Sequence, residues 1–293
     1  MVQNSCNPGF VSLGFRLGKE KLFSYIDKFG FGTKTGVDLN GEGSGIIFNP
    51  DKIGDLELAT TAFGQGVSVT PIQQITAVSA AINGGILYKP YIALSINEPV
   101  NNTAIKINEP VSVRRVISEE TSKKVREALE SVVSLGTGRN AYIDGYRVGG
   151  KTGTAQKVSD GKYMVGNYIV SFIGFLPAND PEVIVYVAID NAKGVTQYGG
   201  TIAAPIARNI LLDAIDILDI KKQDGGTIKE YNYLDKVIYD VPNVINLDLK
   251  EAKKLLTKFK IEYSGNGKRV IFQSPSGGDR IEEGGTIRLL LGE

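Results

Sequence analysis

The chain has 293 residues, enough for one large domain and a small one, and its 33 Lys and Arg residues nearly balance its 32 Asp and Glu residues. This balance argues against a nucleic-acid partner. The absence of histidine excludes Ser-His-Asp triads and most zinc sites, and the single cysteine excludes an internal disulfide. We therefore expect no metal and no cofactor, and any proton transfer must use Lys, Tyr, Asp or Glu.

Four segments with apolar residues at helical spacing indicate helices, and glycines end several of them. The first carries Leu13 and Leu17 on its apolar face, and a glycine-rich loop region follows it to about Asp55. The predicted helices run from Pro8 to Phe29, from Thr70 to Gly84, from Ser118 to Gly136 and from Ile202 to Ile217.

Three further segments favour strands because they are rich in β-branched and aromatic residues. They run from Tyr146 to Lys157, from Tyr168 to Leu176 and from Val183 to Ile189. The turn residues Asn179, Asp180 and Pro181 predict a hairpin between the last two. Long helices beside hairpin-linked strands indicate an α+β fold with an antiparallel sheet covered by helices.

The C-terminal part of the sequence predicts a separate small domain. Residues 219–240 are polar and predict a linker between a first domain at 1–218 and a second at 241–293. In the second domain we expect a helix from about Leu249 to Phe259, with strands near 261–263, 270–273 and 286–291. Its predicted core residues are Leu255, Leu256, Ile271 and Leu289.

The motif Lys151-Thr152-Gly153-Thr154 on the first predicted strand offers an ammonium group, two hydroxyls and, at the glycine, backbone without a side chain. Such a strand suits acyl transfer, because the lysine and the hydroxyls can hold a carboxylate and a backbone N–H can face a developing oxyanion. Ser5-Cys6-Asn7 supplies a hydroxyl and an amide that can face this strand. The alternatives are an ordinary edge strand for the first motif and a helix cap for the second.

One competing motif overlaps this strand and a second follows it. Residues 145–152 match the P-loop pattern G-x-x-x-x-G-K-[ST], which leaves a P-loop ATPase as an alternative. A P-loop must lead directly into a helix, and the residues after Thr152 are poor helix formers. The single Ser-x-x-Lys match, from Ser159 to Lys162, contains Asp-Gly and indicates a hairpin loop, so we reject Ser159 as a nucleophile.

Cys6 has two interpretations. A lone cysteine is more often a small buried residue than a reactive one. Between Ser5 and Asn7, however, it would lie near lysine charge, which favours a thiolate. A redox role for Cys6, pairing with a cysteine outside this chain, is therefore a hypothesis.

Together these motifs resemble those of class B penicillin-binding proteins, the peptidoglycan D,D-transpeptidases, and the segment from Val241 resembles a PASTA domain. The resemblance implies a β-lactamase/transpeptidase-like fold for the first domain. A cysteine inside Ser-x-Asn and a single C-terminal PASTA domain resemble the sporulation-specific branch of the class. Further motifs in the family's order are Thr35–Leu39, Gly64–Gly66, Asn83–Gly85, Ser171–Phe175, Gly199–Gly200 and Ala203–Pro205.

The resemblance also implies a role for each site residue. Ser5 would relay a proton, Asn7 would bind the donor peptide and orient the catalytic lysine, and Lys151 would supply positive potential. The hydroxyls would hold the carboxylate of a D-Ala-D-Ala stem peptide or of a β-lactam. The catalytic residues predicted in this way are Ser5, Asn7, Lys151 and Thr154, and the substrate-binding residues are Thr152, Gly153, Thr154 and Gln156.

In that family a nucleophilic Ser-x-x-Lys precedes Ser-x-Asn by some tens of residues, whereas four residues precede Ser5 here. We therefore expect the C-terminal part of a transpeptidase, without its nucleophile, pedestal domain and membrane anchor, and inactive alone. The parent protein would act at the extracytoplasmic face of the cell membrane with a glycosyltransferase, division or sporulation partner. The alternative is a non-catalytic module that binds peptidoglycan or a partner protein.

Overall fold

The computed structural model describes residues 1–159, 161–228 and 238–293, and the chain divides into two compact units, Met1–Lys229 and Glu230–Glu293. The helices of the first unit are α1 (Asn7–Leu17), α2 (Lys19–Lys28), α3 (Asp55–Ala62), α4 (Pro71–Ile82), α5 (Glu119–Ser134) and α6 (Gly199–Leu218). Its strands are β1 (Ile86–Lys89), β2 (Ser95–Asn97), β3 (Ala104–Ile107), β4 (Val111–Arg115), β5 (Gly149–Ser159), β6 (Lys162–Leu176) and β7 (Val183–Asp190). Among the described residues, no helix has the length and hydropathy of a membrane span.

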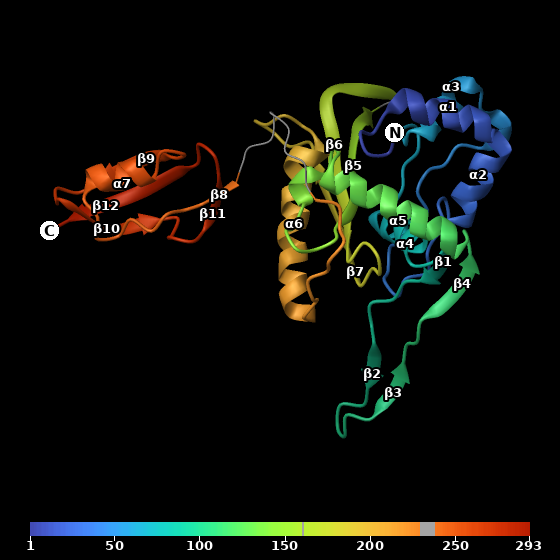
Figure 1. Cartoon of the computed structure of the whole chain (residues 1–293). Helices are drawn as coiled ribbons and strands as arrows, with labels where there is room; N and C mark the ends of the chain where they lie inside the picture. The colour runs from blue at the N-terminus through green and yellow to red at the C-terminus, as the bar shows by residue number, and fades with distance from the viewer. Residues whose placement is uncertain (160, 229–237) are drawn as a thin grey trace. The chain divides into compact units, whose positions relative to one another are not determined.

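An antiparallel sheet in the order β5-β6-β7 forms the centre of the first unit (Figure 1). Successive residues of β6 point to opposite faces of this sheet. Phe172 packs in one buried cluster with Ala207 and Leu211 of α6, whereas Phe175 packs in another with Ile82 of α4 and Leu129 of α5. Helices therefore cover both faces, and the predicted α+β arrangement is confirmed.

The N-terminal helical stretch differs from the prediction of one helix. The chain breaks between α1 and α2 at Gly18, whose φ of 82° no helix can accommodate, and two helices replace one. Leu13 and Leu17, which we expected on a buried face, have exposed fractions of 44% and 38%. The apolar spacing was similar on both sides of Gly18, so periodicity alone could not show the break.

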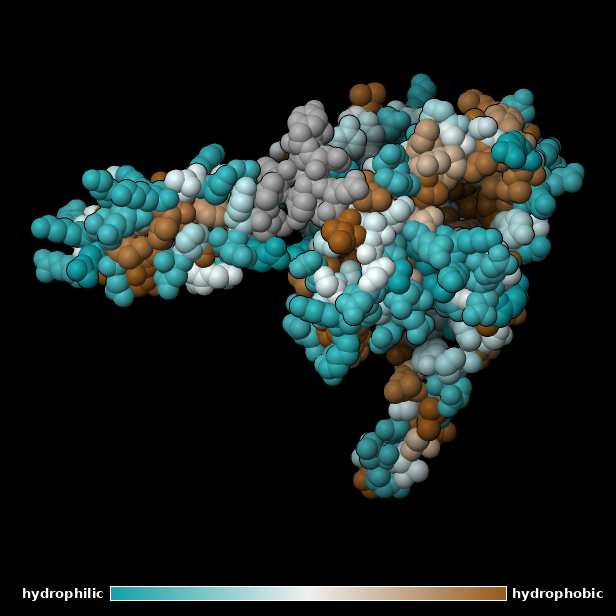
Figure 2. All heavy atoms as spheres, viewed as in Figure 1, coloured by the Kyte–Doolittle hydropathy of each residue, from teal (hydrophilic) through white to brown (hydrophobic). Residues whose placement is uncertain are grey.

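A projecting β-hairpin was missed in the sequence. Strands β2 and β3 pair with each other, and β1 pairs with β4 at the base (Figure 1). The carboxylate of Asp38 anchors this base, because it accepts the backbone N–H groups of Ile92 and Ala93 at 2.6 and 2.9 Å. Apolar side chains remain exposed along the hairpin (Figure 2): Ile92, Leu94, Ile96, Val100, Ile105 and Ile107. Strands of three to five residues are too short for a clear period-2 signal.

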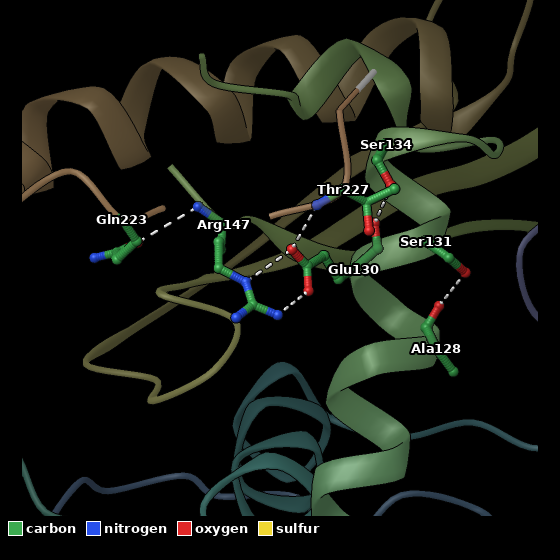
Figure 3. A network of polar contacts seen from close by, with 7 residues as sticks. All are labelled: Ala128, Glu130, Ser131, Ser134, Arg147, Gln223 and Thr227. Atoms are coloured by element: carbon green, nitrogen blue, oxygen red, sulfur yellow. Dashed lines mark hydrogen bonds and ion pairs between the residues drawn. The ribbon is translucent and has the colours of Figure 1, made fainter. Parts of the chain in front are cut away.

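The residues that follow α6 fold back onto the first unit (Figure 3). The backbone N–H of Gln223 donates to the carbonyl of Gly145 at 3.0 Å, and the N–H of Thr227 lies 3.4 Å from Oε1 of Glu130. The predicted linker covers residues 219–240. Its first part is thus held against α5 and the segment before β5. Residues 229–237 of that linker lie outside the described residues.

The second unit contains β8 (Ile238–Asp240), α7 (Leu249–Leu255), β9 (Lys260–Ser264), β10 (Arg269–Ser274), β11 (Arg280–Glu282) and β12 (Thr286–Gly292). Strands β10, β12 and β9 form one sheet in that order, and β11 pairs with β8. The prediction that Leu256 and Leu289 are core residues is confirmed, since their exposed fractions are 0% and 2%.

The other two predicted core residues of this unit are wrong. Leu255 and Ile271 have exposed fractions of 51% and 49%. Val270 turns inward, so alternation turns Ile271 outward, and the register shift between Val270 and Phe272 then turns Gln273 inward in place of Phe272. The bulge thus leaves Phe272 on the exposed side beside Ile271, which strict alternation cannot anticipate.

Candidate active site

The start of β5 is held closely against β6 by two glycines. A Cβ at Gly149 would lie 2.3 Å from the ring of Phe175, and one at Gly150 would lie 2.4 Å from the ring of Phe172. No side chain fits at either position, so the backbone of β5 packs directly on the two buried rings. The next residue is Lys151, whose position is therefore set by this close packing of β5 on β6.

Lys151 and Ser5, which are 146 positions apart in the sequence, meet in the structure. Nζ of Lys151 donates to Oγ of Ser5 at 2.8 Å and to the carbonyl of Thr152 at 2.9 Å. Ser5 has a φ of 51°, in the left-handed region that few non-glycine residues adopt. The predicted proximity of the Ser-x-Asn segment and the lysine strand is thus observed.

The ammonium group of Lys151 has no carboxylate partner among the described residues. Burial lowers the pKa of Lys151 from 10.5 to about 8, because a desolvated ammonium loses its hydration and neutral oxygens replace it only in part. At pH 7 the group is still mostly charged and supplies positive potential. Near pH 8 about half of it is a neutral amine that can accept a proton.

Two threonine hydroxyls lie beside this lysine on β5. Oγ1 of Thr152 lies 3.0 Å from Oγ1 of Thr137, which follows α5. Oγ1 of Thr154 accepts the backbone N–H of Gly199, the first residue of α6, at 3.3 Å. A Cβ at Gly199 would lie 2.2 Å from the carbonyl of Ser171, so only glycine permits this approach. The positive end of the α6 dipole therefore adjoins Thr154.

The remaining predicted site residues are Asn7, Gln156 and Gly153. Asn7 is exposed as the first residue of α1, and within the described residues its side chain makes no hydrogen bond to Lys151. Gln156 lies further along β5, opposite Tyr168. Gly153 lies close to β6, since a Cβ there would lie 2.5 Å from Oγ of Ser171, and its substrate-binding role stays a prediction.

Cys6 is a free, exposed thiol at the N-cap of α1. Its redox role stays a prediction. Two residues of the site were missed in the sequence, namely Gln3 and Thr137, whereas Gly199 belongs to a motif of the resemblance but its contact with Thr154 was not foreseen. Each takes part through contacts distant in the chain, and no local sequence signal could have found them.

The structure also decides between the competing motifs on β5. The strand continues to Ser159 without any helix after Thr152, so the P-loop interpretation is wrong. Ser159 and Lys162 face each other at the closed end of the β5–β6 hairpin, which confirms the predicted turn. Asp160, between them, lies outside the described residues.

Comparison with known protein families agrees with this geometry. The family model of the penicillin-binding protein transpeptidase domain matches residues 1–212, and the PASTA domain model matches residues 239–293. The chain belongs to the penicillin-binding protein transpeptidase family. It combines a transpeptidase domain of this family with a C-terminal PASTA domain.

Relatives of the transpeptidase family include a sporulation protein. The chain is 57% identical to stage V sporulation protein D of Bacillus subtilis over 293 residues, covering 100% of this chain and 45% of that protein. It is 32% identical over 221 residues to the probable peptidoglycan D,D-transpeptidase PenA of Neisseria meningitidis, covering 75% of this chain and 36% of that protein. The chain thus spans less than half the length of these relatives.

Solved structures support the transpeptidase fold. Penicillin-binding protein 3 of Mycobacterium tuberculosis, complexed with ampicillin, superimposes with a TM-score of 0.70 at 28% identity, covering 79% of this chain and 54% of that chain. The transpeptidase domain of penicillin-binding protein 3 from Burkholderia pseudomallei superimposes with a TM-score of 0.66 at 30% identity, covering 75% of this chain and 63% of that chain. The predicted β-lactamase/transpeptidase-like fold is confirmed.

Proposed function

We propose that this chain forms two walls of the active site of a peptidoglycan D,D-transpeptidase, which cross-links stem peptides through a serine acyl-enzyme. The observation that carries the proposal is the 2.8 Å contact between Nζ of Lys151 and Oγ of Ser5. A hydroxyl held by a lysine of lowered pKa can pass a proton between a nucleophile and a leaving amine. In this proposal Ser5 relays the proton, and Lys151 hydrogen-bonds the Ser5 hydroxyl and supplies positive potential.

The proposed ligand group is a carboxylate, that of a D-Ala-D-Ala stem peptide or of a β-lactam. Lys151 and the N-terminus of α6 both place positive potential beside the hydroxyls of Thr152 and Thr154. β5 is the outer strand in the order β5-β6-β7, so an extended peptide can add to its edge. Gly153, Gln156 and the backbone N–H of Thr154 would then line the bound peptide, and Asn7 would orient it.

The nucleophile is proposed to come from a segment outside these 293 residues. The single Ser-x-x-Lys of the sequence begins at Ser159, eight residues along the extended strand from Lys151. Eight residues of β-strand span roughly 26 Å, too far for proton transfer between the two side chains. The chain alone is therefore expected to take no covalent label from a fluorescent penicillin, and labelling of the purified chain would contradict this part of the proposal.

A binding experiment tests the carboxylate site without the nucleophile. A peptide ending in D-Ala-D-Ala and its C-terminal carboxamide would be titrated into the full chain and followed by NMR. We expect the carboxylate peptide to bind more tightly, and Lys151→Met to weaken that binding at least tenfold. Lys157→Met is the matched control, since Lys157 lies on the same strand but pairs with Asp190. Equal losses in both variants, or no preference for the carboxylate, would contradict the proposal.

The wider role is proposed to be cell-wall synthesis during sporulation, at the extracytoplasmic side of the cell membrane. The 57% identity to stage V sporulation protein D supports this context. A glycosyltransferase or another sporulation protein is the proposed partner, because cross-linking needs freshly polymerised strands.

A second candidate function belongs to the PASTA domain. It has a buried core of its own, built from residues such as Val244, Leu256 and Ile287, and it matches a family model by itself. We propose that it binds peptidoglycan. Pull-down on purified peptidoglycan should retain the full chain and release a chain without residues 241–293, whereas equal retention would assign binding to the transpeptidase domain.

A further inference from the structure

The turn that carries Ser5 is attached to the end of α5 by Gln3. The side-chain amide of Gln3 donates to the carbonyl of Leu135 at 3.2 Å, and the carbonyl of Gln3 accepts the backbone N–H of Thr137 at 3.1 Å. Gly136 lies between these two contacts, and a Cβ there would lie 2.2 Å from the Gln3 carbonyl oxygen. Residues 135–137 thus contact Gln3 through their backbone, and a side chain at position 136 would not fit there.

These contacts also complete the end of the helix. Leu135 is the C-cap of α5, and the last carbonyls of a helix have no partner within it. The amide of Gln3 supplies a donor for one of them. The interaction therefore fixes both partners, since the helix end gains a donor and the N-terminal segment gains a defined position.

Ser5 needs such support because its own conformation is unfavourable. It holds a φ of 51° inside a turn closed by its backbone N–H and the carbonyl of Val2 at 3.2 Å. A non-glycine residue persists in this region only when its surroundings determine it. Gln3 lies between the two ends of that turn, and its contacts to α5 hold the turn by long-range hydrogen bonds in addition to the one between Ser5 and Lys151.

We propose that Gln3 is a positioning residue, which docks the Ser5 turn on the C-terminal end of α5 and so sets the contact between Ser5 and Lys151. The inference rests on the transpeptidase function proposed above, because it assigns Gln3 to the proton-relay geometry of that site. Gln3 touches neither a ligand nor a reacting atom in this role. It acts through the placement of Ser5.

The titration of Lys151 reports this placement. The partners of its ammonium group in the described part of the chain are neutral oxygens of Ser5 and Thr152, and no charged side chain faces it there. Release of the Ser5 turn would admit water to the ammonium group. Its charged form would then be better solvated, and its pKa would move upward from about 8 toward 10.5.

The experiment measures this pKa by NMR in the full chain labelled with ¹³C at lysine Cε, with Lys151→Arg used to assign the resonance. Gln3→Leu removes the amide donor at similar volume, and Gly136→Ala displaces Gln3 from the side of α5. Each variant is expected to lower the acid dissociation constant of Lys151 about tenfold, a rise of one pKa unit. Gln197→Leu is the control, since Gln197 is also half-buried and donates its amide to a backbone carbonyl, that of Gly166 at 3.0 Å.

The outcomes separate a positioning role from a stabilising one. If Gln3→Leu and Gly136→Ala lower the melting temperature but leave the Lys151 pKa unchanged, Gln3 only stabilises the fold and the proposal is overturned. If Gln197→Leu raises that pKa equally, the effect is not specific and the proposal is also overturned. The titration needs no ligand, so its result stands whether or not the chain binds a D-Ala-D-Ala peptide, and the two proposals can fail separately.

Discussion

Two cations four residues apart in the sequence, Arg147 and Lys151, have opposite environments in this protein. Arg147 donates to Glu130 through Nε at 3.0 Å and through Nη2 at 2.6 Å, and this hydrogen-bonded carboxylate raises the pKa of Arg147 (Figure 3). Among the described residues, the ammonium group of Lys151 contacts neutral oxygens only, and burial lowers its pKa to about 8. Among the described residues, the charge of Arg147 is paired with a carboxylate and that of Lys151 is not.

We propose that the difference separates a structural cation from one that binds an anionic ligand. The bidentate pair of Arg147 and Glu130 joins α5 to the segment before β5 and holds Thr227 of the segment after α6. A guanidinium suits this role because its planar donors match a carboxylate. A partly buried ammonium without a carboxylate partner costs stability, and its presence at Lys151 supports the proposal that this group binds an anionic ligand.

The largest expected effect comes from removing one partner of the compensated pair. Glu130→Leu leaves Arg147 half-buried without a carboxylate, and we expect the free energy of unfolding of the first unit to fall by about 3 kcal/mol. Urea unfolding measures the loss. The double variant Glu130→Leu/Arg147→Met should recover most of it, because no charge is then left unpaired. A double variant as unstable as the single one would show that packing, and not charge, dominates.

Removing the uncompensated cation should have the opposite sign. The difference between pKa values of 10.5 and about 8 corresponds to an upper limit of roughly 3 kcal/mol, so we expect Lys151→Met to raise the free energy of unfolding at pH 7 by about 1–2 kcal/mol. The folded state binds fewer protons than the unfolded state between pH about 8 and 10.5. Wild-type stability should therefore rise with pH across this window relative to Lys151→Met. A constant difference between the two chains would contradict the lowered pKa.

A carboxylate placed beside Lys151 should give this lysine a charged partner like the one that Arg147 has. Ser5→Asp places an anion within about 3–4 Å of Nζ of Lys151, and an opposite charge at this range raises a lysine pKa by about 1–2 units. Aspartate also tolerates the left-handed conformation found at residue 5. NMR titration of Lys151 measures the shift. Ser5→Ala is the control, since it adds no charge and should not raise the pKa to the same extent.

The smallest effect is expected at Lys157, a third cation on β5. It pairs with Asp190 at 2.7 Å, but the side chain of Asp190 is 61% exposed. Exposed pairs contribute little, and we expect Lys157→Met to change the free energy of unfolding by less than about 0.5 kcal/mol. The change should shrink further in 1 M salt. A loss as large as that of Glu130→Leu would remove the distinction between buried and surface pairs.

Several elements could be predicted because their signals are local. The helix from Pro71 begins with proline after the capping residue Thr70, and the β6–β7 hairpin has two apolar strands around a turn. The projecting hairpin and the break at Gly18 could not be predicted, because short strands and a repeated apolar spacing leave no distinctive period. In the second unit, a register shift that depends on pairing with β12 decided that Gln273 turns inward and Phe272 outward.

By itself, the order of residues determined the family, the antiparallel sheet and the lysine strand, since glycines, β-branched runs and short motifs act within a few neighbours. Only the tertiary structure decided which groups meet Lys151 and which meet Arg147. Gln3 meets Leu135, and Ser5 meets Lys151, across 132 and 146 positions of the chain. Burial, which lowers the pKa of one cation, and pairing, which raises that of the other, are properties of packed surroundings and leave no trace in local sequence.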